Sequence, residues 1–284
     1  MKRTARELSY IATQCRLNVM RMLAASGHGH VGGAMSAMDI AVALYFGEMN
    51  IDPHNPKKRD RDRFILSAGH KCLAQYAILA EMGYFDKKIL DTYGSLNSRI
   101  PGHPNMHELP GIEANTGALG HGLSIANGMA AALKLQKLNS RVFVIMGDGE
   151  LPEGSNWEAA AQAAKFELDN LVLFVDYNGL QISGHVEDVL NMQPIEEKFK
   201  AYGWDTHIIE NGNDMTQIID SLDKINYTCK KPHVFIAKTV KAKDVVGGEN
   251  NVAYHFWKPS PEQIQQTVDY LNQKANKLQK AMEA

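Results

Sequence analysis

The chain has 284 residues, of which 44% are hydrophobic and 22% charged, a balance typical of a soluble globular protein with one large or two small domains. Its 30 basic and 32 acidic side chains give a net charge of −2, which offers no general attraction to nucleic acid or to an anionic membrane. The three cysteines, Cys15, Cys72 and Cys229, form no CxxC pair, so a disulfide framework or a thiolate zinc site is not expected and the cytoplasm is the natural location. The basic N-terminus has no apolar run behind it, and the longest apolar stretches are strand-sized, so we expect neither a secretory signal nor a membrane span.

The first third of the chain contains two predicted helices, one strand and a long loop. Apolar residues recur at helical spacing over residues 5–25, and Ser36 with Asp39 resembles a capping box that opens the next helix. A short buried strand is predicted at 64–66. Residues 92–122 then combine recurrent Gly and Pro with histidines and apolar anchors, and loops of this length in compact domains are usually functional.

Strands and helices alternate through the rest of the chain. Strands are predicted at 142–146, 171–175, 207–209 and 234–237, and helices at 121–138, 157–166, 218–225 and about 260–282, while 241–251 has the composition of a mobile loop. The runs at 142–146 and 171–175 are continuously apolar, which suits a parallel sheet covered on both faces. We therefore predict an α/β fold over residues 1–284, a single domain with a doubly wound, mostly parallel sheet flanked by helices, whose ligands bind beyond the carboxyl ends of the strands.

Polar residues with metal-binding chemistry follow two of these strands. Gly147, Asp148 and Gly149 follow the strand at 142–146, and Asn178 follows the next. The glycines let the backbone approach a ligand, and the carboxylate, the amide oxygen and a nearby backbone carbonyl suit a hard cation that also binds phosphates. A plain turn at Gly-Asp-Gly is the alternative. A dinucleotide-binding fold is not indicated, because no GxGxxG motif follows a first strand in this sequence.

Four stretches together resemble the N-terminal half of transketolase. They are the Gly-His motif at 26–33, the sequence Asp-Arg-Phe-Ile-Leu-Ser-Ala-Gly-His at 62–70, the Pro-Gly-His-Pro to Thr-Gly-Ala-Leu-Gly-His-Gly segment at 101–122, and the Gly-Asp-Gly motif with its later Asn, which is the thiamine diphosphate signature. The matches occur in family order and cover about residues 10–260. The resemblance implies the diphosphate-binding domain of the thiamine-diphosphate-binding fold.

The resemblance also implies roles for individual residues. The divalent ion, Mg²⁺ or Ca²⁺, would be held by Asp148, Asn178 and the Leu180 carbonyl. His70, Gly149 and His255 would bind the phosphates of the cofactor, and Gly147 of the metal motif would also bind the cofactor. Gly117 and Leu119 would contact its aminopyrimidine ring and Ile182 its thiazolium ring. Glu153 would lie at a subunit interface that communicates between sites. The catalytic histidines that surround the sugar hydroxyls would be His30, His70, His103 and His255. His28 is the alternative to His30. Next to His255, Phe256 stands where the family usually has Gly.

The chemistry implied by the family explains the histidines. Thiamine diphosphate supplies the nucleophile and electron sink, and a substrate hydroxyl must lose a proton as a C–C bond breaks. Imidazole can take and return that proton near neutral pH. A two-carbon ketol unit then passes from a ketose to an aldose, as in the pentose phosphate pathway.

A separate partner chain is also expected. In the family the second half supplies a glutamate for the aminopyrimidine, an aromatic pocket and the groups that bind a sugar phosphate, whereas a polar helix alone is predicted after residue 260. The resemblance thus implies the N-terminal subunit of a split transketolase, paired in a heterotetramer with a C-terminal, pyrimidine-binding subunit. Its sugar could be phosphorylated, sulfonated or branched.

Two other functions remain open at this point. One is half of another thiamine-diphosphate enzyme, such as a 1-deoxyxylulose-5-phosphate synthase-like half or an α-keto acid dehydrogenase α subunit; the histidines at 30, 70 and 103 favour transketolase over the dehydrogenases. The other is a non-catalytic cofactor-binding subunit, which the retained Asp148 and Asn178 disfavour.

Overall fold

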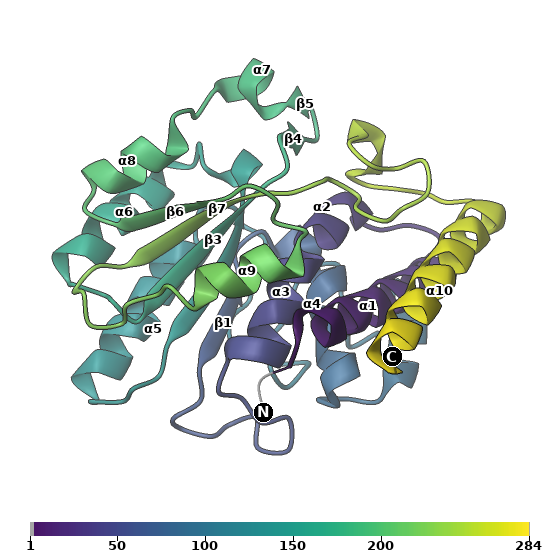
Figure 1. The fold of residues 1–284 in the computed structure, drawn as a ribbon, viewed down its shortest axis with the longest axis horizontal. Helices are drawn as coiled ribbons and strands as arrows, with labels where there is room; N and C mark the ends of the chain where they lie inside the picture. The colour runs from purple at the N-terminus through teal and green to yellow at the C-terminus, as the bar shows by residue number, and fades with distance from the viewer. Residues whose placement is uncertain (1–2, 284) are drawn as a thin grey trace.

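The computed structural model describes residues 3–283 and contains a five-stranded parallel sheet between two layers of helices (Figure 1). The strand order is β1-β2-β3-β7-β6, with β1 Arg63–Leu66, β2 Val142–Gly147, β3 Leu171–Tyr177, β7 His233–Lys238 and β6 Asp205–Ile209. All four neighbouring pairs are parallel. The predicted fold class is therefore confirmed, and each of the five predicted strands is present.

Two hydrophobic clusters cover the two faces of the sheet, because successive side chains of a strand point to opposite faces. Phe143 and Phe174 face one cluster, together with residues of α1, α3, α4 and α9, whereas Val144 and Leu173 face the other, with residues of α5, α6 and α8. The helices are α1 Ala5–Ser26, α2 Val31–Ser36, α3 Met38–Ala43, α4 Cys72–Met82, α5 Gly122–Leu135, α6 Gly154–Lys165, α7 Val186–Leu190, α8 Ile195–Ala201, α9 Met215–Leu222 and α10 Pro261–Glu283. A small antiparallel hairpin joins β4 Leu180–Gln181 to β5 Gly184–His185.

The N-terminal helix α1 begins and ends with the signals expected of a helix. Thr4 and Glu7 form a capping box at its start, and Gly27, with φ of 73°, ends it in the left-handed conformation. The helix α10 runs alongside α1, so the two ends of the chain lie in the same layer (Figure 1).

A buried ion-pair network fixes the predicted loop at 241–251. Asp244 in this segment lies 3.3 Å from the Arg16 guanidinium of α1 and 2.7 Å from the Lys274 ammonium of α10, and its side chain is buried. Arg16 also pairs with Asp39 of α3 at 2.6 Å. The segment has no regular helix or strand, as predicted, but its buried anchor ties it to three helices.

The helical layer differs from the sequence-based predictions in the start of α3 and in the presence of α2, α4, α7 and α8, none of which is predicted from the sequence. Ser36 does not cap a helix: it is the last residue of α2, α3 begins at Met38 without a side-chain cap, and the Ser36 hydroxyl donates to the Asp176 carboxylate at 2.6 Å. The helix α4 is absent from the sequence-based predictions. Residues 72–80 are all buried, so this helix has no polar face and lacks the periodicity that identifies a surface helix.

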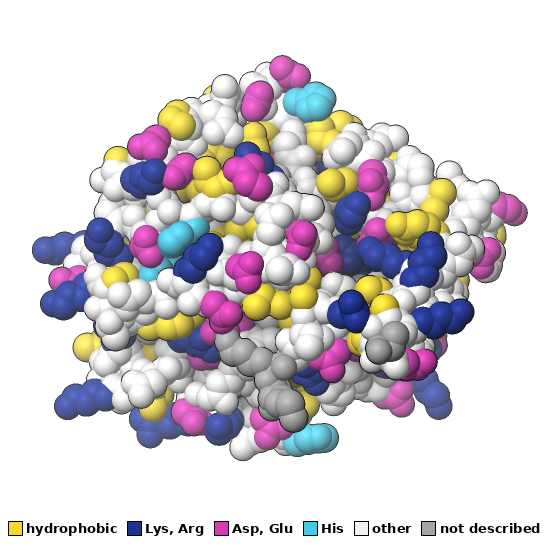
Figure 2. Space-filling view, viewed as in Figure 1, with side chains coloured by type: hydrophobic (Ala, Val, Ile, Leu, Met, Phe, Trp, Pro, Cys, Tyr) yellow, Lys and Arg dark blue, Asp and Glu magenta, His cyan; other side chains and the backbone are white. Residues whose placement is uncertain are grey.

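The loop predicted at 92–122 is confirmed. Residues 93–121 are all described and contain neither helix nor strand. Acidic and basic side chains are interspersed on the face drawn in Figure 2. Within residues 3–283, no helix combines the length and apolar character needed to span a bilayer.

Candidate active site

A cavity of about 410 Å³ lies beyond the carboxyl ends of β1, β2 and β3. The segments after the strand ends supply part of its lining. The remainder comes from the turn and helix at 30–33, the loop residues 103 and 117–119, the β4 hairpin and the segments around 241 and 255. It is lined by these site residues predicted from the sequence: His30, His70, His103, Gly117, Leu119, Gly147, Asp148, Gly149, Asn178, Leu180, Ile182 and His255. Glu153, which the resemblance also assigns to the cofactor site, is exposed at the start of α6 and does not line the cavity.

The predicted metal ligands lie together at one side of the cavity. The register between β2 and β3 pairs Gly147 with Asp176, so the residues that follow each strand meet at the same edge. One oxygen of Asp148 accepts a hydrogen bond from the Gly149 N–H at 2.8 Å and the other from the Gly179 N–H at 2.6 Å. The Asn178 side-chain oxygen accepts from the Leu180 N–H at 3.1 Å. Asp148, Asn178 and Leu180 thus line the same cavity and offer it a carboxylate, an amide oxygen and a backbone carbonyl.

The electrostatics of Asp148 fit a cation at this position. The carboxyl is 2% exposed, and burial raises its pKa to about 6, with the Asp176 carboxylate adding to the shift and Lys71 opposing it. The charged form is therefore poorly compensated by the protein alone. An oxygen-only set of ligands is the set preferred by Mg²⁺ and Ca²⁺, so the residues present fit a hard divalent ion.

Close backbone approach requires glycine at two positions of the cavity wall. Gly117 has φ of 138°, and a Cβ there would lie 2.6 Å from Cδ2 of His103. A Cβ on Gly149 would lie 3.1 Å from Cβ of Gln181, so glycine keeps the end of β2 clear of the β4 hairpin. These glycines hold the space in which a ligand would sit.

Glu150 joins three parts of the cavity wall. It follows the Gly-Asp-Gly motif, but the sequence assigns it no role. Its carboxylate accepts hydrogen bonds from the Ser67 hydroxyl at 2.5 Å, the Gly120 N–H at 2.8 Å and the Gly147 N–H at 3.3 Å. Burial raises the pKa of Glu150, and the bond from Ser67 partly offsets this effect. The residue holds the ends of β1 and β2 against the loop at 117–120.

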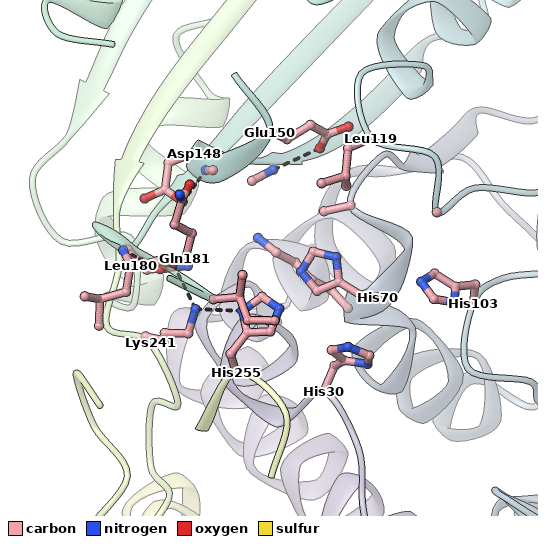
Figure 3. A pocket seen from close by; sticks show the side chains of 18 residues that line it. His30, His70, His103, Leu119, Asp148, Glu150, Leu180, Gln181, Lys241 and His255 are labelled. Carbon is pink, nitrogen blue, oxygen red and sulfur yellow. Dashed lines mark hydrogen bonds between the residues drawn. The ribbon is translucent and has the colours of Figure 1, made fainter. Parts of the chain in front are cut away.

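Four histidines gather at the opposite side of the cavity, where Figure 3 shows their rings around a common space. The ring centroids of His70 and His255 are 5.2 Å apart, and His30 lies 5.5 Å from His70, 5.6 Å from His255 and 6.2 Å from His103. Paired backbone hydrogen bonds between Gly29 and Trp257, at 3.0 and 2.9 Å, bring the two chain segments together.

The surroundings of three half-buried rings of this histidine cluster favour their neutral form. Burial lowers the pKa of His70 to about 2, helped by Lys71, and that of His255 to about 4, helped by Lys241. Burial and the neighbouring His103 also lower the pKa of His30. A neutral imidazole offers one donor and one acceptor, so each of these rings can hydrogen-bond a hydroxyl.

The structure distinguishes the two candidate histidines of the Gly-His-Gly-His motif. His30 lines the cavity, whereas His28 is exposed and stacks on Phe256 with ring centroids 5.4 Å apart. Phe256 also meets His30 edge-on at 4.9 Å. The bulky residue that replaces the usual glycine therefore packs beside the histidine cluster without displacing His255 from the cavity.

Two buried lysines of the cavity are missing from the residues predicted from the sequence. The Lys71 ammonium lies 2.5 Å from the Asp176 carboxylate, and Lys241 donates to the Leu180 carbonyl at 2.8 Å and lies 3.2 Å from Nδ1 of His255 (Figure 3). Burial, with a contribution from Lys71, lowers the pKa of Lys241 to about 8. Lys71 directly follows a motif histidine, but nothing in the sequence indicates that these two lysines meet. Together they make the cavity suitable for an anionic group.

Comparisons with known proteins agree with this geometry. The family model described as "Transketolase, thiamine diphosphate binding domain" matches residues 8–267. The chain is 43% identical over 253 residues to an apulose-4-phosphate transketolase subunit of Phocaeicola vulgatus, covering 89% of each chain. It is 39% identical over 257 residues to a 6-deoxy-6-sulfo-D-fructose transketolase subunit of Clostridium sp., covering 89% of this chain and 93% of the relative.

Solved structures show the same fold. A transketolase variant from Pichia stipitis superposes with a TM-score of 0.85 at 27% identity, over 99% of this chain and 45% of that one. The transketolase of Campylobacter jejuni gives a TM-score of 0.82 at 27% identity, over 100% of this chain and 49% of that one. The chain thus spans less than half the length of these solved transketolases.

Proposed function

Because the chain belongs to the transketolase family through its thiamine diphosphate-binding domain, we propose that it is the N-terminal subunit of a split transketolase. It would be one subunit of a transferase of aldehyde or ketone residues. The apulose-4-phosphate and sulfofructose relatives are both named as subunits and match this chain over most of their length, which supports a separate C-terminal, pyrimidine-binding partner in a heterotetramer. Residues 1–284 would then form one diphosphate-binding domain.

The main support for the proposal is that oxygen ligands for a metal ion and cationic side chains line one cavity. Asp148, Asn178 and the Leu180 carbonyl would hold Mg²⁺, or Ca²⁺ in its place, and the ion would bind the cofactor diphosphate. Lys241 adds a positive charge beside these oxygens. The remaining cofactor contacts would come from Gly147, Gly149, His70 and His255 at the phosphates, and from Gly117, Leu119 and Ile182 at the two rings.

When bound, thiamine diphosphate supplies the nucleophilic carbon and electron sink of ketol transfer. The chain's own contribution is the group of imidazoles. His30, His70 and His103 would hydrogen-bond the substrate hydroxyls, and a ring nitrogen would accept the hydroxyl proton released as the C–C bond breaks. As the two-carbon unit forms its new C–C bond to the carbonyl carbon of the acceptor aldose, the proton would be returned to the carbonyl oxygen of that aldose.

A modified sugar is the substrate class that we propose. The relatives are named for a phosphorylated apulose and a sulfonated fructose, and such names support a ketose with an unusual or charged end rather than a keto acid. Glu153, exposed beside Gly120 at the start of α6, would contact another protein chain of the assembly. The free cysteines support a reducing cytoplasm as the place of reaction.

Replacement of Asp148 tests the metal and cofactor assignment. Asp148→Ala should weaken magnesium-dependent binding of thiamine diphosphate by more than about 100-fold, since even outer-shell partners of a metal typically contribute about 10–100-fold. Isothermal titration calorimetry measures the affinity with and without Mg²⁺. The control Asp269→Ala removes an exposed carboxylate of α10 and should bind as the unchanged chain does. Equal affinity in Asp148→Ala would contradict the assignment.

The proposed partner is tested separately. The purified chain, supplied with Mg²⁺ and thiamine diphosphate, should show little ketol transfer from a ketose donor to an aldose, and addition of a transketolase C-terminal subunit should restore it. Size-exclusion chromatography with light scattering should detect the assembly. Full turnover by the chain alone would contradict the partner proposal while leaving cofactor binding intact.

A further inference from the structure

Three side chains with metal-binding chemistry meet at the start of β6 and β7, at the opposite edge of the sheet from the cavity. The strands are parallel neighbours, and their register pairs Asp205 with His233. Alternate residues of a strand point to the same face, so His207 lies on the same face as Asp205. The strand pairing therefore brings a carboxylate and two imidazoles together.

The distances between these groups are close to those of a metal centre. The Asp205 Oδ2 atom lies 3.0 Å from Nε2 of His207 and 3.1 Å from Nδ1 of His233. One ligand atom from each residue lies within 4.8 Å of the others. Ligands of Zn²⁺ at about 2.0–2.2 Å in tetrahedral geometry are about 3.3–3.6 Å apart, so a small outward movement would admit the ion.

Neighbouring groups fix the two rings. His207 stacks on Phe235 with centroids 4.9 Å apart and planes 17° from parallel. The His233 side chain is fully buried, its Nε2 lies 3.8 Å from the Cys229 sulfur, and the Asn226 backbone hydrogen-bonds the ring. Such outer contacts hold metal-binding imidazoles in orientation.

Access also suits a ligand set. The side chains of Asp205 and His207 are 37% and 28% exposed, so an ion can reach them and keep a water molecule as a fourth ligand.

We propose that Asp205, His207 and His233 form a binding site for a divalent transition-metal ion, with Zn²⁺ as the preferred ion. Imidazole and carboxylate are suitable ligands for Zn²⁺, in contrast to the oxygen-only set of the cavity. The ion would link the edge strand β6 to β7. The site is independent of the proposed transketolase function.

The test is a count of bound ions in the full chain, in excess Mg²⁺. Titration with Zn²⁺ by calorimetry, and with Co²⁺ followed by its visible absorption, should show one equivalent fewer in His207→Ala and in Asp205→Asn than in the unchanged chain. Zinc should also raise the melting temperature of the unchanged chain more than that of either variant. His54→Ala, which removes an exposed histidine from a loop, is the matched control and should bind as many ions as the unchanged chain.

Comparison with the cavity makes the test decisive. His233 is buried, so its replacement is not used. Circular dichroism should show that His207→Ala and Asp205→Asn are folded. Asp148→Ala and His70→Ala should keep the ion that His207→Ala loses. The proposal is overturned if His207→Ala binds as many equivalents as the unchanged chain with affinity within about threefold, or if the zinc disappears in the cavity variants instead.

Discussion

Burial shifts the pKa of Asp148 and the pKa values of half-buried cavity histidines in opposite directions. Burial raises the pKa of Asp148 and lowers the pKa values of His70 and His255, so both kinds of group are driven toward their neutral forms. A carboxylate in this position gains from a bound cation. Imidazoles in this position keep one donor and one acceptor with which to hydrogen-bond hydroxyls.

His103 differs from the other cavity histidines because it is exposed and lies on the long loop. His103→Ala should lower kcat by about 100-fold or more, the usual size of a general acid–base contribution, while the Kd for thiamine diphosphate changes by less than about threefold. Steady-state kinetics of the assembled enzyme and calorimetry of the chain provide the two numbers. His107→Ala, in the same loop and outside the cavity lining, is the control. A collapse of cofactor affinity with unchanged kcat would assign His103 to the cofactor instead.

At the scale of elements, the buried ion pairs connect helices that are far apart in the chain. Arg16 of α1 contacts both oxygens of Asp39 on α3, at 2.9 and 2.6 Å, and donates to the Met35 carbonyl at 3.1 Å. Asp244 completes the group and is bound in turn by Lys274 of α10. The irregular segment that supplies Lys241 to the cavity is thus positioned by the helices α1 and α10, which lie at the two ends of the chain.

Removal of one partner from this ion-pair network should lower the stability of the folded domain. Asp39→Ala should lower the free energy of unfolding by about 3 kcal/mol, the lower end of the range for breaking a buried pair, because Asp244 still faces Arg16. Urea unfolding followed by circular dichroism measures the change. The control Asp91→Ala breaks an exposed pair with Arg21 and should cost less than about 1 kcal/mol. Equal effects of the two replacements would show that the buried network contributes no more than a surface pair.

At the scale of the whole molecule, one sheet separates two hydrophobic clusters and presents different chemistry at its two edges. The carboxyl edge carries the cavity, and the amino edge of β6 and β7 carries the Asp205, His207 and His233 group. Because both clusters pack on the same strands, we expect the domain to unfold as a cooperative unit.

The acid stability of the whole domain should depend on Asp244. Burial by itself would raise the pKa of this carboxyl, but Arg16 and Lys274 hold it below the ordinary value of 3.8. A depressed folded-state pKa stabilises the protein above the unfolded value, and this contribution is lost as pH falls through about 4 and below. Thermal melts between about pH 3 and 6 should therefore show a smaller decrease in melting temperature for Asp244→Asn than for the unchanged chain. A parallel decrease in both proteins would contradict the prediction.

Much of the fold and part of the candidate site could be predicted from local sequence. The strands β2 and β3 are identifiable because fully buried strands are continuously apolar. Asp148 and Asn178 lie at the same edge of the sheet because neighbouring parallel strands bring their carboxyl ends to one edge. The helix α4 escapes prediction because burial on all sides removes the polar face that reveals a helix. The spacing of Ser36 to Asp39 suits a helix cap, whereas the Ser36 hydroxyl binds Asp176.

The sequence by itself determined the α/β class, the Gly-Asp-Gly and Asn motif and the histidines resembling a known family, because these signals depend on spacing within short segments. Tertiary structure alone decided that His30 rather than His28 lines the cavity, that Lys71 and Lys241 enter it, and that Glu153 stays outside. It also placed Asp205 beside His233. The physical reason is that these contacts depend on strand order and register, which join residues distant in the chain and leave no periodic trace in the sequence.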